Sequence, residues 1–219
     1  FVIYYMEHSG FTTSDLKSQL ALCRGLDLVP LVRPPEKSYS SASKLLDLGA
    51  MGLLYPMVES AEEAADLVCW TRYPPGGVRG GMFGGAHDDY GAEAIPDVMA
   101  QAHARTMVCV LIETAKGLAN IDEIMAVPGV DVAFLGHVDL SLSLGIPGQF
   151  DHPDMEAAID QVAAAAARHG KTAGTAVGRA KQGHEFMARG FRMLCYFFDM
   201  GILQRGLTRG IEGLKKSGG

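Results

Sequence analysis

Short apolar segments recur along the chain, each followed by a longer segment in which apolar residues return every three or four positions. Seven short segments are rich in β-branched and aromatic residues and are predicted to be strands: residues 1–6, 28–32, 52–57, 107–112, 130–135, 172–177 and 191–197. Helical spacing marks residues 41–50, 59–72, 155–170 and 179–190. Asp15 and Ser60 are predicted to begin helices, and Ser60 with Glu63 has the form of a capping box.

Strands that alternate with helices and are apolar throughout indicate a parallel sheet covered by helices. The two common closures are a doubly wound sheet and a (β/α)8 barrel. No G-x-G-x-x-G follows a strand, and "GGVRGGMFGG" lacks the Lys-Ser/Thr of a phosphate-binding P-loop, so the barrel is favoured. We expect one barrel domain over residues 1–219, with the first βα unit missing because the chain opens inside a strand. The glycine-rich segment 76–91 is the predicted active-site loop.

Composition narrows the class of protein. The chain has 219 residues, 48% of them apolar and 20% charged, and its net charge of −6 comes without a Lys/Arg cluster. A nucleic-acid binder would need such a cluster to neutralise phosphates, and no apolar run is long enough for a membrane span. No secretory leader is recognisable. The four cysteines lie far apart without a C-x-x-C pair, which predicts reduced thiols in a cytoplasmic protein.

Charged or titratable residues end four of the seven predicted strands. They are Glu7 and His8, Arg33, Glu113, and Asp139. In a parallel barrel the ends of the strands meet at one rim, where catalytic groups lie. We therefore expect these side chains to surround one site.

Glu113 and Asp139 follow consecutive strands and are predicted to bind a divalent metal ion, since Mg²⁺ and Mn²⁺ prefer carboxylate oxygens, water and substrate oxygens. Taken singly, Glu113 could equally be a charge at a helix N-terminus and Asp139 an N-cap. Both together on neighbouring strands favour the metal.

His8 has a side chain suited to a general base, although a histidine at a strand end is more often only hydrogen-bonded. Arg33, before two prolines, could clamp a carboxylate or an enolate, or form a rim salt bridge. His87, His137 and His152 are weaker candidates for residues of the site. Cys195 lies inside a strand without a base near it in the sequence, which argues against a nucleophile.

Several blocks in a fixed order resemble a known family. They are "MEHSG", "VPLVRPP", "LLDLGAMGLLYPMVESAEEAADLV", "TRYPPGGVRG", "LIETAKGLANIDEIMAVPGVD", "FLGHVDLSLSLGIPG" and "GFRMLCYFFDMGIL". Together they are similar to the metal-dependent pyruvate aldolases of the HpcH/HpaI type, which include 4-hydroxy-2-oxoheptanedioate aldolase and 2-dehydro-3-deoxyglucarate aldolase. Macrophomate synthase belongs to the same family, so membership does not fix the reaction.

The resemblance implies a (β/α)8 barrel of the phosphoenolpyruvate/pyruvate type, assembled as a homo-oligomer, usually a hexamer. Its last helix, at about residues 199–215, would pack on a neighbouring subunit. Glu113 and Asp139 would bind the divalent metal, Mg²⁺, Mn²⁺ or Co²⁺. Arg33 would stabilise the pyruvate enolate.

The family pattern also implies further roles in the site. His8 would pair with Asp47 in a base dyad, and Glu7 would lie near the metal-bound waters. Backbone amides around Gly136 and Val138 would face the pyruvate carboxylate.

This sequence departs from the family at three places. Tyr5 stands where many relatives have an aspartate, which changes the polar network near His8. The usual "GPxDLS" is "GHVDLS", which adds the imidazole of His137 at the mouth of the site. A basic loop is replaced by "GMFGGAHDDYG", which contains His87, so we expect an aldehyde other than the family's acidic semialdehydes.

The resulting hypothesis is a metal-dependent aldolase that cleaves a 4-hydroxy-2-oxo acid to pyruvate and an aldehyde, reversibly. No lysine stands at a strand end, so no Schiff base is expected. No nucleotide is expected either, because neither phosphate-binding motif is present. Alternatives with the same enolate are oxaloacetate decarboxylation and macrophomate-synthase-like addition. A barrel that only binds a metal and a keto acid is the non-enzymatic alternative, and the base at His8 argues against it.

Overall fold

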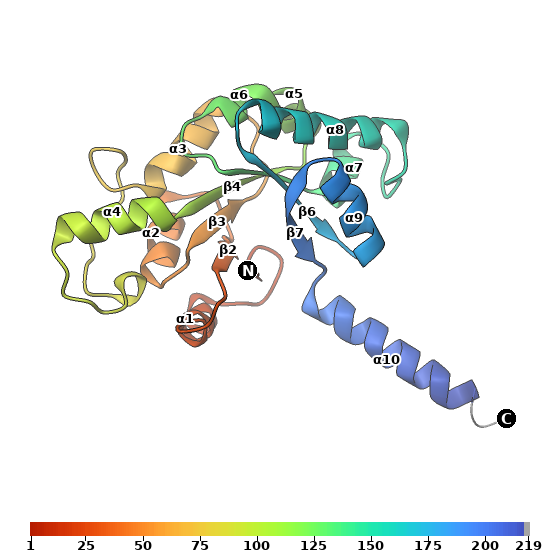
Figure 1. The fold of residues 1–219 in the computed structure, drawn as a ribbon, viewed down its shortest axis with the longest axis horizontal. Helices are drawn as coiled ribbons and strands as arrows, with labels where there is room; N and C mark the ends of the chain where they lie inside the picture. Colours follow the sequence, from red (N-terminus) through yellow and green to blue (C-terminus); the bar gives the residue numbers. More distant parts are fainter. Residues whose placement is uncertain (217–219) are drawn as a thin grey trace.

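The computed structural model describes residues 1–216 and contains one curled sheet of seven parallel strands (Figure 1). The order of strands in the sheet follows their order in the chain, with no crossover. All seven predicted strands are confirmed, each within two residues at either end. The strands are β1 (Val2–Tyr5), β2 (Pro30–Arg33), β3 (Gly52–Tyr55), β4 (Met107–Ile112), β5 (Val132–Leu135), β6 (Thr172–Val177) and β7 (Phe191–Tyr196).

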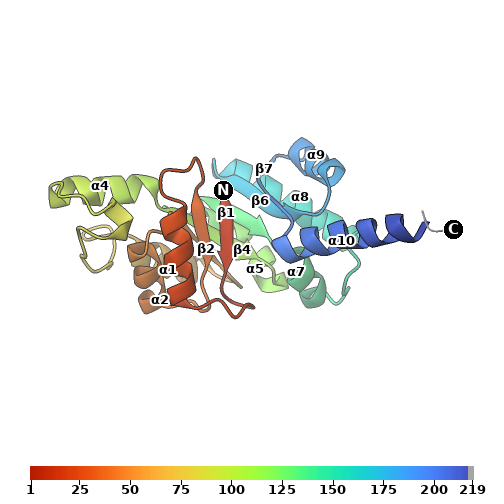
Figure 2. The ribbon, with the colours of Figure 1, turned by 90° about the horizontal axis from the view of Figure 1, so that it is seen from below.

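Helices cover the outer, convex face of this sheet, while α10 projects away from the rest of the molecule in both views (Figures 1 and 2). The α/β class with a barrel-like parallel sheet is confirmed. The helices are α1 (Thr13–Leu22), α2 (Tyr39–Asp47), α3 (Ala61–Thr71), the 3-10 turn η1 (Ala86–Asp88), α4 (Ile95–Arg105), α5 (Ala115–Ala119), α6 (Ile121–Ala126), α7 (His137–Ser143), α8 (Pro153–Arg168), α9 (Ala180–Ala188) and α10 (Asp199–Lys216).

The apolar residues form two layers because side chains alternate across each strand. One layer lies between the sheet and the helices and includes Val32, Val110 and Leu135. A smaller layer fills the inside of the curl and includes Leu31, Leu111 and Phe134. At the strand ends, side chains that continue the inner face of a strand therefore point into the mouth of the curl.

Helix starts follow their capping residues. Ser60 is the predicted N-cap of α3, and its hydroxyl accepts from the Glu63 amide. The Glu63 carboxylate accepts from the Glu59 amide, one residue before the position that a capping box requires. The prediction for Asp15 is wrong: Thr12 is the N-cap of α1, and Asp15 is the third helical residue, which completes a capping box with it.

The glycine-rich segment 76–91 lies at the opposite end of the sheet from the predicted site. It follows α3 and leads through α4 into the start of β4, so it belongs to the end where strands begin. Its contacts agree, because Arg24 after α1 donates to the Ala86 carbonyl. The prediction of an active-site loop there is wrong for this chain. The glycine content indicates a loop, but it does not indicate at which end of the sheet the loop lies.

Candidate active site

Arg33 is the centre of the predicted site, at the end of β2. Its Nε donates to Glu7 Oε2, and its Nη2 donates to Glu113 Oε1 at 3.3 Å. The Arg33 side chain is only 6% exposed, so its charge is compensated by two carboxylates rather than by water. Its Nη1 has no hydrogen-bond acceptor in residues 1–216.

Tyr5 closes the third side of Arg33. The guanidinium carbon lies 4.7 Å from the centre of the Tyr5 ring, within the range of a cation–π contact. Burial raises the pKa of the Tyr5 hydroxyl, as do Glu7, Glu113 and Asp139, while Arg33 lowers it. The Tyr5 ring thus supplies an aromatic face that fixes the guanidinium.

Glu113, directly after β4, is held from two further sides. The amide of Met57 donates to Glu113 Oε1 at 2.8 Å, and Met57 adopts a positive φ of 51°. A Cβ placed on Gly136 would lie 2.7 Å from Glu113 Oε2, so the glycine leaves room for this oxygen. Both hydrogen bonds go to Oε1, which leaves Oε2 for another ligand.

Glu113 and Asp139 interact through their charges. Burial raises the pKa of the Glu113 carboxyl to about 7; Arg33 and the Met57 amide lower it, and Asp139 and Glu7 raise it further. Asp139 makes no side-chain hydrogen bond or ion pair within the described part of the chain. A buried carboxylate beside a second one without a partner is an arrangement that a cation would stabilise.

These two residues fit a hard divalent cation. No group of three or more His, Cys, Asp or Glu side chains in residues 1–216 is arranged to hold a metal. Mg²⁺ and Mn²⁺ are commonly bound by one or two carboxylates, with water and substrate oxygens in the other positions. Glu113 Oε2 and the Asp139 carboxylate would be the protein ligands of such a site.

His8 lies at the open mouth, with 63% of its side chain exposed. Its Nε2 is 3.6 Å from Glu7 Oε1, and its ring is 5.8 Å from that of Tyr5. Glu7 therefore lies between His8 and Arg33 and contacts both.

Asp47 does not join His8 within one chain. It ends α2, which runs back towards the start of β3, and its Oδ1 accepts from Arg79 Nη2 at 2.7 Å. Arg79 is almost fully buried, and its guanidinium lies 4.6 Å from the centre of the Tyr73 ring. The predicted dyad is thus separated by the length of the sheet, and Glu7 is the carboxylate beside His8.

His137 points away from the mouth of the site. Its Nδ1 is 3.2 Å from Thr175 Oγ1, and its ring makes edge contacts with Phe186 and Phe150. Thr175 and Phe186 lie on the helix side of the sheet, so the prediction of an imidazole at the site mouth is wrong. Burial lowers the pKa of His137 to about 4, which keeps the ring neutral near pH 7.

The backbone amides after β5 divide into two groups. The Gly136 amide donates to the Ile112 carbonyl and is not free for a substrate. Leu140 is the first residue of α7 whose amide bonds within the helix, to the Gly136 carbonyl. The Val138 amide precedes it, and its role in binding the substrate carboxylate stays a prediction, whereas Gly136 leaves space for Glu113.

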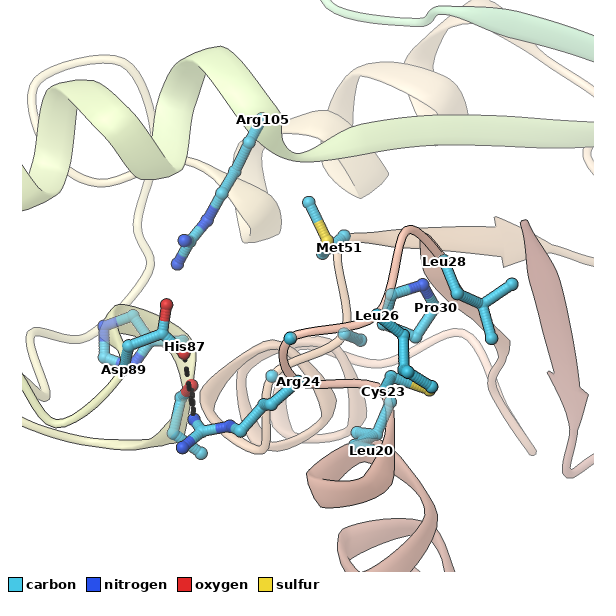
Figure 3. A pocket seen from close by; sticks show the side chains of 14 residues that line it. Leu20, Cys23, Arg24, Leu26, Leu28, Pro30, Met51, His87, Asp89 and Arg105 are labelled. Atoms are coloured by element: carbon cyan, nitrogen blue, oxygen red, sulfur yellow. Dashed lines mark hydrogen bonds and ion pairs between the residues drawn. The ribbon is translucent and has the colours of Figure 1, made fainter.

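His87 belongs to a different cavity, at the end where the strands begin (Figure 3). It is buried, and its Nε2 lies 3.3 Å from the Tyr73 hydroxyl. The prediction of His87 as a loop residue of the active site is therefore wrong for this chain.

Sequence reasoning missed two contacts in the site. Met57 supplies an amide to Glu113 from a left-handed backbone conformation, which the Tyr55-Pro56-Met57 sequence does not indicate. The packing of Tyr5 on Arg33 was also not foreseen. The period-two pattern of β1 was the available signal, because it places Tyr5 on the same inner face as Ile3.

Comparison with known proteins gives the family. The sequence profile of the HpcH/HpaI aldolase/citrate lyase family matches residues 2–205. The 5-keto-4-deoxy-D-glucarate aldolase of Klebsiella pneumoniae is 31% identical over 210 residues, which cover 96% of this chain and 81% of that protein.

Solved structures agree. An HpcH/HpaI aldolase from Desulfitobacterium hafniense superposes with a TM-score of 0.93 at 30% identity, covering 97% of this chain and 82% of that one. Macrophomate synthase superposes with a TM-score of 0.87 at 25% identity, covering 99% and 77%. The chain therefore belongs to the HpcH/HpaI aldolase/citrate lyase family and is a carbon–carbon lyase.

Proposed function

We propose that this protein is a divalent-metal-dependent aldolase that cleaves a 4-hydroxy-2-oxo acid into pyruvate and an aldehyde, and catalyses the reverse addition. The observation that carries the proposal is the buried cluster of Arg33 with Glu7 and Glu113 beside the unpaired Asp139. The similarity to 5-keto-4-deoxy-D-glucarate aldolase supports the substrate class.

Cleavage of the bond between C3 and C4 leaves an enolate whose charge must be stabilised. A divalent cation held by Glu113 and Asp139 would supply Lewis-acid stabilisation of the substrate oxygens. The N–H groups of Arg33 Nη1 have no acceptor within the described chain, and they would donate to the developing enolate or its carboxylate. Since Glu7, Glu113 and Tyr5 fix the guanidinium beforehand, little reorganisation accompanies the reaction.

A base must also remove the proton of the 4-hydroxyl group. His8 is exposed at the mouth, and its imidazole is a side chain that can take up the hydroxyl proton as a general base. Glu7 Oε1, 3.6 Å from His8 Nε2, would stabilise the imidazolium that forms. The amide of Val138 would bind the substrate carboxylate.

The test is pyruvate release from a panel of 4-hydroxy-2-oxo acids, with EDTA and then with Mg²⁺, Mn²⁺ or Co²⁺ added back. We expect activity to disappear on chelation and to return with metal. Turnover that chelation leaves unchanged would contradict the Glu113/Asp139 site.

Oxaloacetate decarboxylation and addition to an unsaturated partner use the same enolate, and the likeness to macrophomate synthase makes them the alternatives to test. Oxaloacetate assayed beside the hydroxy-oxo acids separates them, since an aldolase releases pyruvate faster from the latter. Binding of pyruvate and metal without turnover on any substrate would favour a binding protein instead.

A further inference from the structure

A second cavity lies at the end of the sheet where the strands begin, remote from Arg33 and Glu113. It has a volume of about 200 Å³ and is bounded by the end of α1, the start of β2, the loop before β3, η1 and the end of α4. Pockets for drug-sized ligands have volumes of roughly 300–1,000 Å³. This cavity therefore suits a smaller molecule.

Its walls differ from one side to the other (Figure 3). Apolar side chains, among them Leu26, Leu28 and Met51, line one side. Arg24, Arg105 and Asp89 line the other. Two guanidinium groups face one carboxylate, so the polar side carries a net positive charge.

Arg105 is partly buried, yet it has no hydrogen-bond or ion-pair partner among residues 1–216. Figure 3 shows its guanidinium directed towards Asp89 and His87. Arg24, in contrast, donates to the Ala86 carbonyl and lies 3.6 Å from Asp89. A partly desolvated guanidinium without a partner favours an anion.

The buried wall of the cavity offers a second unpaired group. Nδ1 of His87 is buried without a hydrogen-bond partner, while its other nitrogen contacts the Tyr73 hydroxyl. Asp89 and Tyr90, which follow η1, both adopt positive φ angles, 55° and 57°, which non-glycine residues rarely do. Strained backbone of this kind occurs preferentially at ligand sites.

We propose that this cavity binds a small organic monocarboxylate with an apolar body, its carboxylate between Arg105 and Arg24 and its body against Leu26, Leu28 and Met51. The apolar wall favours such an anion over inorganic phosphate, which would leave that wall without a contact. Asp89 also disfavours a dianion, because its own charge faces the same space.

The test uses the full chain labelled with ¹³C at the methionine methyl groups, with benzoate as the probe. The Met51 signal is assigned through Met51→Leu. EDTA and the background substitution Arg33→Met remove binding at the proposed active site, so this experiment can fail or succeed independently of the proposed function. We expect the Met51 signal to move saturably with benzoate and much less with the neutral isostere benzyl alcohol.

Arg105→Met should raise the benzoate concentration needed for half-saturation at least about tenfold, since charge-assisted hydrogen bonds contribute about 1.5–3 kcal/mol. Arg168→Met is the matched control on the exposed surface of α8 and should change nothing. If Arg105→Met fails to fold, Arg24→Met tests the same site.

Three results would overturn the proposal. A Met51 signal that does not move with benzoate excludes the site. Equal effects of benzoate and benzyl alcohol exclude recognition of the anion. Saturation by inorganic phosphate at the same concentration as benzoate excludes the apolar body as part of the ligand.

Discussion

Arg33 has little freedom to move, because Glu7, Glu113 and the face of Tyr5 contact three parts of one planar group. An arginine can satisfy this geometry since its donors lie in one plane and its face can stack on a ring. The identity of residue 33 therefore fixes the relative positions of two acidic groups from β1 and β4.

Arg33→Lys tests this geometry. A lysine keeps the charge but cannot donate to Glu7 and Glu113 while stacking on Tyr5, so kcat/KM for pyruvate release should fall about 10²- to 10³-fold. Arg168→Lys, at an exposed ion pair on α8, is the control. Steady-state kinetics on both variants decides, and a loss of less than about threefold for Arg33→Lys would contradict the role.

Gly136→Ala tests the space around Glu113. The new methyl group would lie 2.7 Å from Oε2 and 2.8 Å from Cβ of Glu113, so the carboxylate must shift. We expect Mn²⁺ affinity, measured by calorimetry, to fall about tenfold or more. Gly183→Ala is the control, since its Cβ would meet Leu194 and Val177 at the ordinary distances of 3.7 and 3.8 Å.

His137 supports a prediction on acid stability. Its pKa is lowered to about 4 in the folded protein, whereas the unfolded chain protonates it near 6.5. Between these values the unfolded state binds more protons, so stability falls as the pH drops from about 6.5 to 4, by roughly 3 kcal/mol from this residue.

Urea unfolding of the metal-free protein at several pH values measures this effect. His137→Asn keeps a group that can bond to Thr175 but does not titrate, so its unfolding free energy should depend less steeply on pH than that of the parent. Parallel pH profiles for the two proteins would show that His137 does not titrate in this way.

At the scale of elements, each strand was predictable because a buried parallel strand is apolar on both faces, as in Met107–Ile112. The rim residues Arg33 and Glu113 were predictable for the same reason, since a charge that ends such a run lies at the strand end. The partner of His8 was not. Family similarity named Asp47, whereas the direction of α2 places that residue at the far end of the sheet.

The glycine-rich segment 76–91 illustrates another limit. Its composition indicates a loop, yet only its position after α3 and before β4 tells which end of the sheet it joins. Met57 is the converse case, because nothing in its side chain indicates the positive φ that turns its amide towards Glu113.

The capping box of α1 gives a prediction at this scale. Thr12 and Asp15 each accept from the other's backbone amide, and Thr12→Ala removes one of these bonds. The free energy of unfolding should fall by about 1 kcal/mol. Thr13→Ala, at the first helical position, makes no capping contact and should cost less; equal losses in urea unfolding would contradict the assignment.

At the scale of the whole molecule, α10 leaves an apolar face without a partner. Met200, Leu203, Leu207, Ile211 and Leu214 recur at helical spacing, and each is more than half exposed. Its first turns are fixed to the body, since Arg205 donates to the Gly178 carbonyl and lies 4.0 Å from the centre of the Phe197 ring. We propose that this face packs on a second copy of the chain, as the family resemblance implies.

Leu203→Glu combined with Leu207→Glu tests the contact. Two charges on the apolar face should prevent association and give a lower molar mass by light scattering after gel filtration. Thr208→Glu adds a charge outside this apolar face and should leave the mass unchanged. A parent protein that is already monomeric would contradict the proposal.

The order of the strands bears on how the molecule forms during synthesis. Because β1 to β7 pair only with their neighbours in the chain, each strand after β1 can pair with a strand that has already been synthesised. Arg33 can thus meet Glu7 once β2 has emerged, 80 residues before Glu113 is translated. The ion pair between Arg33 and Glu7 would then be present at the rim before Glu113 and Asp139 are synthesised.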